Sequence, residues 1–311
     1  MHAFLQQLIN GLSIGAVYAL IALGYSMVYG VLKLINFAHG DVYMVGAVIA
    51  YHISRWLAHS GVSPVLGMCV MFIAAMAGCA ALGWAIEFFC YRPLRNRPRL
   101  VSLITAIGVS LLLENLLQQS RFLFGPTPRS LPQTFQSRPV IEFFAATSSP
   151  ITITNLDLVS WSLCLIVMVA LTWFVMRTRM GLALRAVSFR VDTSALMGIN
   201  TGWVISMTFV IGSALAAVAG VVDAMRYQVD PLMGLQQGIN AFVAAVLGGI
   251  GNIPGALLGG LLMGLVQTLL KGWVLQGAYS GYADAASFLV LILVLLARPT
   301  GLLGKPTIEK V

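Results

Sequence analysis

Long apolar runs constrain the fold of this chain more than any other feature of its sequence. A helix needs about 20 largely apolar residues to cross the hydrocarbon core of a bilayer, and runs such as Leu8–Tyr29, Ser63–Cys90 and Trp203–Met225 reach that length. Lipid offers no hydrogen-bond partners, so such runs must be helices or irregular backbone buried in a bundle. We therefore expect an all-α polytopic membrane protein with about eight to ten transmembrane helices, some of them broken or re-entrant.

Composition supports this class and excludes others. Hydrophobic residues make up 59% of the chain and charged residues only 9%. The net charge of +8 fits loops beside anionic lipid, because no basic run with interleaved aromatic residues indicates nucleic-acid binding. The four cysteines lie within or at the ends of apolar runs without CxxC spacing, which is typical of packing residues. The first 20 residues contain no Lys or Arg and no A-x-A site, so we expect a retained first span.

Three basic segments set the expected topology. The segment Arg177–Asn200 carries four arginines (Arg177, Arg179, Arg185, Arg190), the stretch YRPLRNRPR carries four more, and RPTGLLGKPTIEK closes the chain. Loops rich in Lys and Arg beside spans stay in the cytoplasm. Alternating the spans places all three there and leaves the proline-rich Gln118–Asp157 outside. We expect one transmembrane domain over residues 1–311.

The segment 177–200 is predicted to be more than a connector. Met180–Val187 suits a short helix, and Asp192 can N-cap a second piece that Gly198 would end. Gly181 permits close approach of another backbone segment, and the Arg185 guanidinium could bind an acidic groove on a partner protein through two parallel hydrogen bonds. These features favour a docking surface, and a solvated loop that only sets topology is the alternative.

The first interruption of the apolar pattern joins two early spans. It holds Asn36, Phe37, His39, Gly40 and Asp41, in a polar turn too short to be a soluble loop. One interpretation is a broken helix that lines a translocation path or its gate, since irregular backbone at membrane depth survives only beside protein or a cavity. The other is a hairpin at the cytoplasmic surface with Asp41 as an N-cap.

Two further interruptions are candidates for the same path. Glu114 and Asn115 lie inside a span, where an ionisable residue is a functional candidate, although Glu114 could also reach the outer interface. Gly248, Gly249 and Gly251 belong to a glycine-rich break whose exposed backbone dipoles can meet a polar substrate or a partner helix. A tight hairpin between packed helices is the alternative for this break.

Several motifs are missing. The chain has no GxxxxGK[ST] loop, so any ATP hydrolysis must come from another polypeptide. No GxSxG, HExxH or paired His/Cys cluster indicates an enzyme, and we expect no catalytic residue, metal or cofactor. An ion-coupled secondary carrier would need a charged site inside the bundle, for which Glu114 and Asp223 are candidates. That class stays open as an alternative.

The motifs together resemble a known family. They are YALIALGYSMVYGVLKLINFAHGDVYMVGA, YRPLR, SLITAIGVSLLLEN, RMGLALRAV, LMGIN, TFVIGSALAAVAGV, AFVAAVLGGIGNIPGALLGGLLMG and RPTGLLG. They resemble the permease subunits of branched-chain amino-acid ABC importers, and most of all the H-type member of the permease pair. The likeness runs nearly end to end and is weakest over Arg121–Asn155.

The resemblance implies a multi-pass permease in the bacterial inner membrane. It implies pairing with a second homologous permease, two cytoplasmic ATPase subunits, and a periplasmic binding protein that delivers leucine, isoleucine or valine. Related permeases carry urea, amides and aromatic acids, so the substrate is less well specified than the family. The resemblance also makes Arg177–Asn200 the expected ATPase coupling segment.

Overall fold

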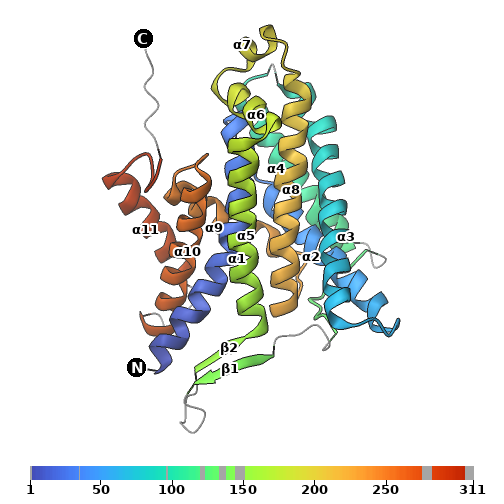
Figure 1. The fold of residues 1–311 in the computed structure, drawn as a ribbon, viewed down its shortest axis with the longest axis vertical. Helices are drawn as coiled ribbons and strands as arrows, with labels where there is room; N and C mark the ends of the chain where they lie inside the picture. The colour runs from blue at the N-terminus through green and yellow to red at the C-terminus, as the bar shows by residue number, and fades with distance from the viewer. Residues whose placement is uncertain are drawn as a thin grey trace. The chain divides into compact units, whose positions relative to one another are not determined.

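The structure is a computed structural model. It describes residues 2–34, 36–95, 97–119, 123–132, 138–143, 151–274 and 282–304. Over these ranges the chain is mainly helical (Figure 1), as the apolar runs predict. The α-helices are α1 (His2–Leu32), α2 (His39–Ala58), α3 (Pro64–Ala85), α4 (Arg99–Gln119), α5 (Asn155–Arg177), α6 (Arg179–Phe189), α7 (Val191–Leu196), α8 (Thr201–Arg226), α9 (Met233–Gly248), α10 (Ile253–Leu269) and α11 (Ala283–Ala297). Two π-helical turns, Ile86–Tyr91 and Leu270–Val274, extend α3 and α10, and a 3₁₀ turn covers Arg92–Leu94.

The chain divides into two compact units. Unit 1 comprises residues 1–26, 138–169 and 240–311, and unit 2 comprises residues 27–137 and 170–239. The helices α1, α5 and α9 each contribute to both units. The expectation of one transmembrane domain over the whole chain stays a prediction.

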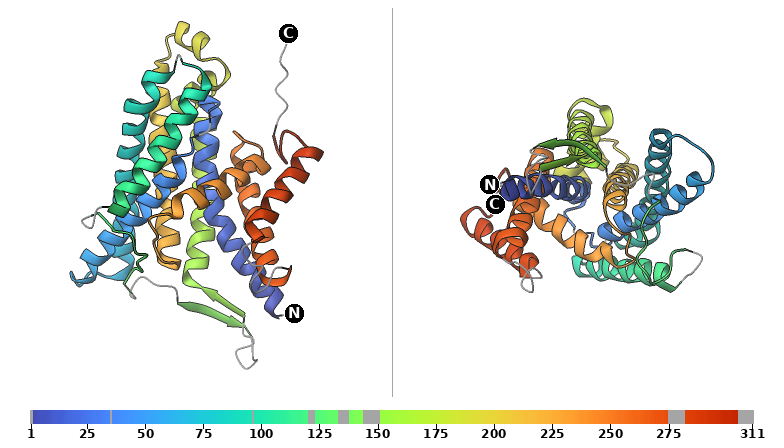
Figure 2. Two further views of the ribbon diagram at one scale, coloured as in Figure 1. Left: turned by 180° about the vertical axis from the view of Figure 1, so that it is seen from behind. Right: turned by 90° about the horizontal axis from the view of Figure 1, so that it is seen from below.

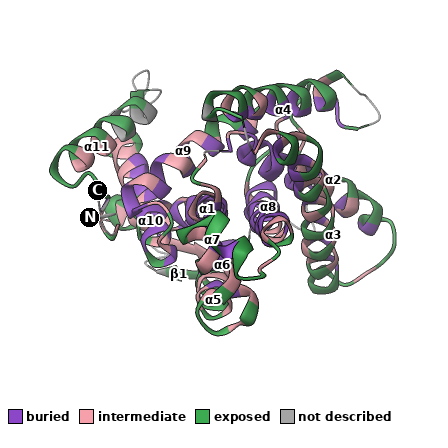
Figure 3. Ribbon diagram, turned by 90° about the horizontal axis from the view of Figure 1, so that it is seen from above, coloured by how far each residue is buried: buried purple, intermediate pink, exposed green. Residues whose placement is uncertain are grey.

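The helix α8 forms the core of unit 2 and packs against α2 and α3. Most of its residues are buried, as the purple of α8 in Figure 3 shows. Small residues make this packing close. A Cβ placed at Gly46 of α2 would lie 2.7 Å from the Cα of Ala217, and one at Gly83 of α3 would meet the side chain of Ser213. Glycine at such positions lets helix backbones approach in a membrane bundle.

In unit 1 the first half of α1 packs against α10. A Cβ at Gly11 would lie 3.0 Å from the Cα of Leu265, and one at Gly15 would lie 2.8 Å from the Cα of Leu261. From the other side, a Cβ at Gly264 would meet the backbone of Gly15. The GxxxG spacings in these two segments therefore mark a real helix contact.

Six helical segments in the described part of the chain are long and apolar enough to cross a membrane. They are His2–Leu32, Pro64–Leu94, Leu100–Gln119, Asn155–Arg177, Thr201–Arg226 and Ile253–Trp273, and several can be followed in Figure 2. The helices α2, α9 and α11 do not meet both criteria, so the expectation of eight to ten transmembrane helices stays a prediction.

A small sheet lies within the region that we expected to be an extracytoplasmic loop. Its strands are β1 (Pro139–Phe143) and β2 (Ile151–Thr154), and they pair antiparallel with Phe143 opposite Ile151. The sequence analysis did not predict it. Residues 120–122, 133–137 and 144–150 of the same loop lie outside the described residues.

Candidate functional site

The break between α1 and α2 leaves Lys33 exposed and buries Asn36 in unit 2. Lys33 has a positive φ of 54° directly after α1, and Asn36 is only 4% exposed. The Asn36 Oδ1 accepts a hydrogen bond of 2.9 Å from the Tyr91 hydroxyl. A surface hairpin would leave these groups in solvent. Their burial favours the broken-helix interpretation.

Asp41 is not an N-cap. The N-cap of α2 is Ala38, which makes no side-chain capping bond, and Asp41 lies in the first turn of the helix. Asp41 is fully buried, so it is withdrawn from the surface where an N-cap of a solvated hairpin would lie. Ala38, the residue before α2, already has dihedral angles in the helical region.

Gly40 and Asp41 meet the start of α9. A Cβ at Gly40 would collide with the carbonyl oxygen of Gly234 and lie 2.7 Å from the Cα of Gly238. A Cβ at Gly234 would in turn meet the Asp41 carboxylate. Asp41 thus lies beside the first turns of α2 and α9, where helix dipoles favour a negative charge.

The structure brings Glu114 to Asp41 but leaves Asn115 apart. Ser110 and Glu114 of α4 are the polar side chains that interact with the Asp41 carboxylate, although neither carboxylate oxygen has a hydrogen bond of standard geometry within the described residues. Glu114 is buried, so it does not reach an exposed interface in unit 2. Asn115 is exposed and bonds the Leu111 carbonyl of its own helix at 2.7 Å.

The remaining residues of the first interruption are less exposed than a loop would be. His39 is 1% exposed, and Phe37 is half-buried. Among the described residues no group of three or more His, Cys, Asp or Glu side chains could hold a metal ion. The four cysteines are free thiols.

The glycine-rich break is occupied by the chain itself. The backbone N–H groups of Leu302 and Leu303 donate to the carbonyls of Leu247 and Gly248, at 2.9 and 3.1 Å. A Cβ at Gly249 would lie 2.5 Å from the backbone nitrogen of Gly304. Gly249 and Gly251 have positive φ angles of 103° and 88°. These contacts favour the tight hairpin, and a role of Gly248, Gly249 and Gly251 in the path stays a prediction.

The predicted helix at 180–187 is confirmed as α6. Thr178 caps it, because its hydroxyl accepts from the Gly181 N–H at 3.0 Å. Gly181 is buried against the end of α5, where a Cβ would collide with the carbonyl oxygens of Phe174 and Val175. The close approach that Gly181 permits is therefore to α5, and its contribution to docking would be to shape this turn.

The second predicted piece is α7, and Gly198 ends it as expected. Gly198 has a φ of 83°, its N–H bonds Ala195, and the N–H of Ile199 bonds Ser194, which is a Schellman arrangement. Asp192 is not the N-cap. Extended backbone at Arg190 starts the helix two residues earlier and leaves Asp192 in the first turn.

The α6–α7 surface exposes apolar and charged side chains together. We use this name for the exposed residues Leu182, Arg185, Phe189, Leu196 and Met197. Phe189 is 86% exposed and Leu196 is 88% exposed. Arg185 has a long contact of 3.5 Å with the Met176 carbonyl. Exposed large apolar side chains with an arginine among them are typical of a protein interface.

Sequence reasoning missed the polar cluster around the buried Glu87. The cluster comprises Glu87, Arg92, Arg95 and Ser206, and it joins the π-helical turn after α3 to α8. On sequence alone, Arg92 and Arg95 are interpreted only as part of a basic segment that sets topology, and Glu87 is given no role. The spacing of an acid five and eight residues before arginines was the available signal.

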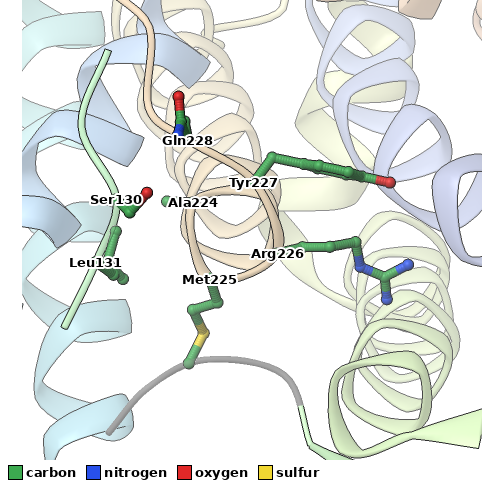
Figure 4. Close-up of a pocket in the computed structure, with 7 residues that line it drawn as sticks. All are labelled: Ser130, Leu131, Ala224, Met225, Arg226, Tyr227 and Gln228. Atoms are coloured by element: carbon green, nitrogen blue, oxygen red, sulfur yellow. The ribbon is translucent and has the colours of Figure 1, made fainter. Parts of the chain in front are cut away.

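A cavity of about 400 Å³ lies at the end of α8 that is farthest from α7 (Figure 4). It is lined by Ser130, Leu131 and Ala224–Gln228. A backbone bridge between Arg129 and Val229 holds the two lining segments together. The cavity and the α6–α7 surface thus belong to opposite ends of α8.

A family model described as "Branched-chain amino acid transport system / permease component" matches residues 7–297. The chain belongs to the branched-chain amino-acid transport permease family. It is a membrane transport subunit, and the family has the all-α polytopic architecture seen here. No solved structure matches the chain.

Curated relatives support this membership in the permease family. The chain is 46% identical to the high-affinity branched-chain amino acid transport system permease protein BraD of Pseudomonas aeruginosa, over 100% of this chain and 99% of that one. It is 44% identical to the corresponding permease protein LivH of Escherichia coli K12, over 99% and 98%. A probable LivH of Methanocaldococcus jannaschii is 26% identical over 92% and 88%.

Proposed function

We propose that this permease forms part of the translocation path of an ABC importer for branched-chain amino acids in a bacterial inner membrane. The observation that carries the proposal is 46% identity over the whole chain to a curated permease protein of a branched-chain amino acid transport system. The match extends across the break at Asn36, the α6–α7 surface and the glycine-rich turn, so no candidate site falls outside it.

The proposed partners are those that such an importer needs. Two cytoplasmic ATPase subunits supply ATP hydrolysis, since this chain has no phosphate-binding loop of the GxxxxGK[ST] type. A second homologous permease completes the path, and a periplasmic binding protein delivers leucine, isoleucine or valine. The α6–α7 surface is the docking site for an ATPase, because it combines exposed apolar side chains with arginine.

The proposed mechanism is alternating access. ATP binding moves the docked α6 and α7, and unit 2 repacks between two discrete arrangements. The buried break at Asn36, with Asp41 and Glu114 beside it, is the part of unit 2 proposed to line or gate the path. Contacts to substrate there need only be weak, because the binding protein selects the substrate.

The test is uptake by reconstituted vesicles. The chain is co-expressed with candidate ATPases, a second permease and a binding protein from the same organism, and the complex is placed in liposomes. We expect uptake of leucine, isoleucine and valine that requires ATP, and no ATP hydrolysis by the permease alone. Uptake driven by an ion gradient without nucleotide would overturn the proposal and favour the carrier. If the complex instead prefers urea or an amide, the chain is still an ABC importer permease, but its substrate differs from the one proposed.

A further inference from the structure

Glu87 is the buried centre of a polar cluster in unit 2. Its side chain is fully buried, and its Oε2 accepts a hydrogen bond of 2.5 Å from the Ser206 hydroxyl of α8. Its Oε1 pairs with the Arg95 guanidinium and lies 3.6 Å from Arg92 Nε. Arg92 also donates to the Ser206 oxygen at 3.2 Å. A buried carboxylate is costly unless it is paired, so this geometry holds α8 and the end of α3 together.

The same π-helical turn reaches the break. Tyr91, its last residue, donates the 2.9 Å hydrogen bond to Asn36, and its ring packs 5.2 Å from that of Phe209 on α8. A π-helical turn is rare, occurs mostly as a single turn within an α-helix, and is frequent at functional sites. Glu87 and Tyr91 of this one turn bind two different partners, Ser206 and Asn36.

Ser206, the partner of Glu87 on α8, lies close to the junction between α8 and α7. Ser206 lies in the second turn of α8, whose N-cap Asn200 accepts from the Trp203 N–H at 3.1 Å. Only residues 197–200 separate α7 from α8, and they are held by the bonds around Gly198. A displacement of α7 must move the first turns of α8, since so short a hydrogen-bonded link cannot absorb it.

We propose that Glu87 is a positioning residue that transmits movement of the α7–α8 junction to the Asn36 break through the π-helical turn. The inference rests on the proposed function only for the statement that an ATPase moves α7. If the π-helical turn Ile86–Tyr91 becomes α-helical, the residues that follow it rotate by about 100° and shift by about 1.5 Å along the helix axis. Tyr91 then leaves Asn36 while Glu87 stays on Ser206. The turn thus supplies two discrete arrangements, which transmission between sites requires.

The experiment separates transport from ATP hydrolysis in the reconstituted complex. Tyr91→Phe removes one hydroxyl and Glu87→Gln removes one charge. We expect each to lower the number of leucine molecules imported per ATP by about tenfold, while ATP hydrolysis stimulated by the binding protein stays within about twofold. Because the two residues act in series, the double variant should be no worse than the poorer single variant.

The matched control is Tyr18→Phe, which removes a buried hydroxyl that bonds Gln267 at 2.5 Å in unit 1. It should lower stability without changing the import ratio. If Glu87→Gln does not assemble, Ser206→Ala breaks the link to α8 and leaves the pairing with Arg95. Equal losses of uptake and hydrolysis, or no change in either, would refute the relay. A wild-type complex without ATP-dependent uptake would instead refute the proposed function.

Discussion

Buried carboxylates recur at the contacts between helices of each unit, and two of them accept hydrogen bonds from a neighbouring helix. Asp157, at the start of α5, accepts from Ser13 of α1 at 2.6 Å and from the Thr154 N–H at 2.8 Å. Asp223 of α8 accepts from the Tyr43 hydroxyl of α2 at 2.5 Å. In hydrocarbon such a pairing specifies which helix faces meet, because the mispaired alternative leaves a charge without a donor.

Asp157→Ala should therefore destabilise unit 1. It leaves Ser13 and Thr154 without their acceptor, and a buried hydrogen bond to a charged group contributes about 1.5–3 kcal/mol. We expect a lower thermal midpoint in detergent, measured by thiol accessibility of the buried Cys164, and a smaller drop for Asp157→Asn. Ser162→Ala on the same helix is the control, because its exposed hydroxyl bonds only the Val159 carbonyl among the described contacts. Equal midpoints for all variants would contradict the structural role.

Sequence reasoning at the residue scale succeeded where a residue's neighbours are local. Gly198 was predicted to end α7 because helix termination depends on a few adjacent residues. The N-cap interpretation of Asp41 was wrong and the role of Glu87 was missed, because Ser206 of α8 and Glu114 of α4 lie far along the chain from them. Pattern alone cannot show that an acid at the end of a span faces two arginines rather than water.

At the scale of elements, the crossing of α2 and α9 depends on the absence of a side chain at Gly40. Gly40→Ala should push the two helices apart, since the new Cβ would collide with the Gly234 carbonyl. We expect uptake to fall by at least about tenfold at equal membrane levels, because a misplacement near 1 Å at a functional site can cost about a hundredfold. Gly108→Ala on α4 is the control, because a Cβ there meets nothing within 4 Å. A loss of uptake in both variants alike would refute the crossing argument.

The α6–α7 surface gives a second prediction at this scale. Arg185→Glu reverses a charge amid exposed apolar side chains and should reduce co-purification of the ATPases and uptake by about tenfold, as expected for one desolvated interface charge. Arg185→Lys keeps the charge and should lose less. Membrane insertion and binding-protein capture should not change. Equal recovery of the ATPases with wild type and Arg185→Glu would move the docking site elsewhere, with the Arg92–Arg99 loop the next candidate.

For the whole molecule, the two ends of α8 set the predicted sidedness. α8 has 26 residues, which span about 39 Å at 1.5 Å per residue, enough to separate α7 from the Arg129–Val229 bridge by a bilayer. Thr193→Cys and Thr127→Cys, made separately in a background without the native cysteines, should react with an impermeant thiol reagent from the cytoplasm and from outside respectively. Labelling from the same side would overturn the topology. Both positions are exposed, so the absence of labelling at either would itself contradict the structure.

The class of the molecule could be predicted almost completely, and its internal division could not. Apolar run length specifies spans because the thickness of hydrocarbon is fixed. The split into two units follows instead from distant contacts such as Gly15 against Leu261, which only weak GxxxG spacings signal. The β1–β2 hairpin was missed because prolines and polar residues around it favour irregular structure.

The docking of residues 301–304 onto the turn after α9 has a consequence for biogenesis. The carbonyls of Leu247 and Gly248 at the end of α9 accept hydrogen bonds from the N–H groups of Leu302 and Leu303. The ribosome adds these two donor residues more than fifty residues after their acceptors, so the bonds form only late in synthesis. The first half of α1 likewise has no packing partner in α10 until α10 has been synthesised. Unit 1 is therefore finished only near the end of synthesis, while residues 27–137 and 170–239 can pack earlier. A nascent chain arrested before Arg298 should have a folded unit 2 and an α9–α10 hairpin that proteases can still cleave.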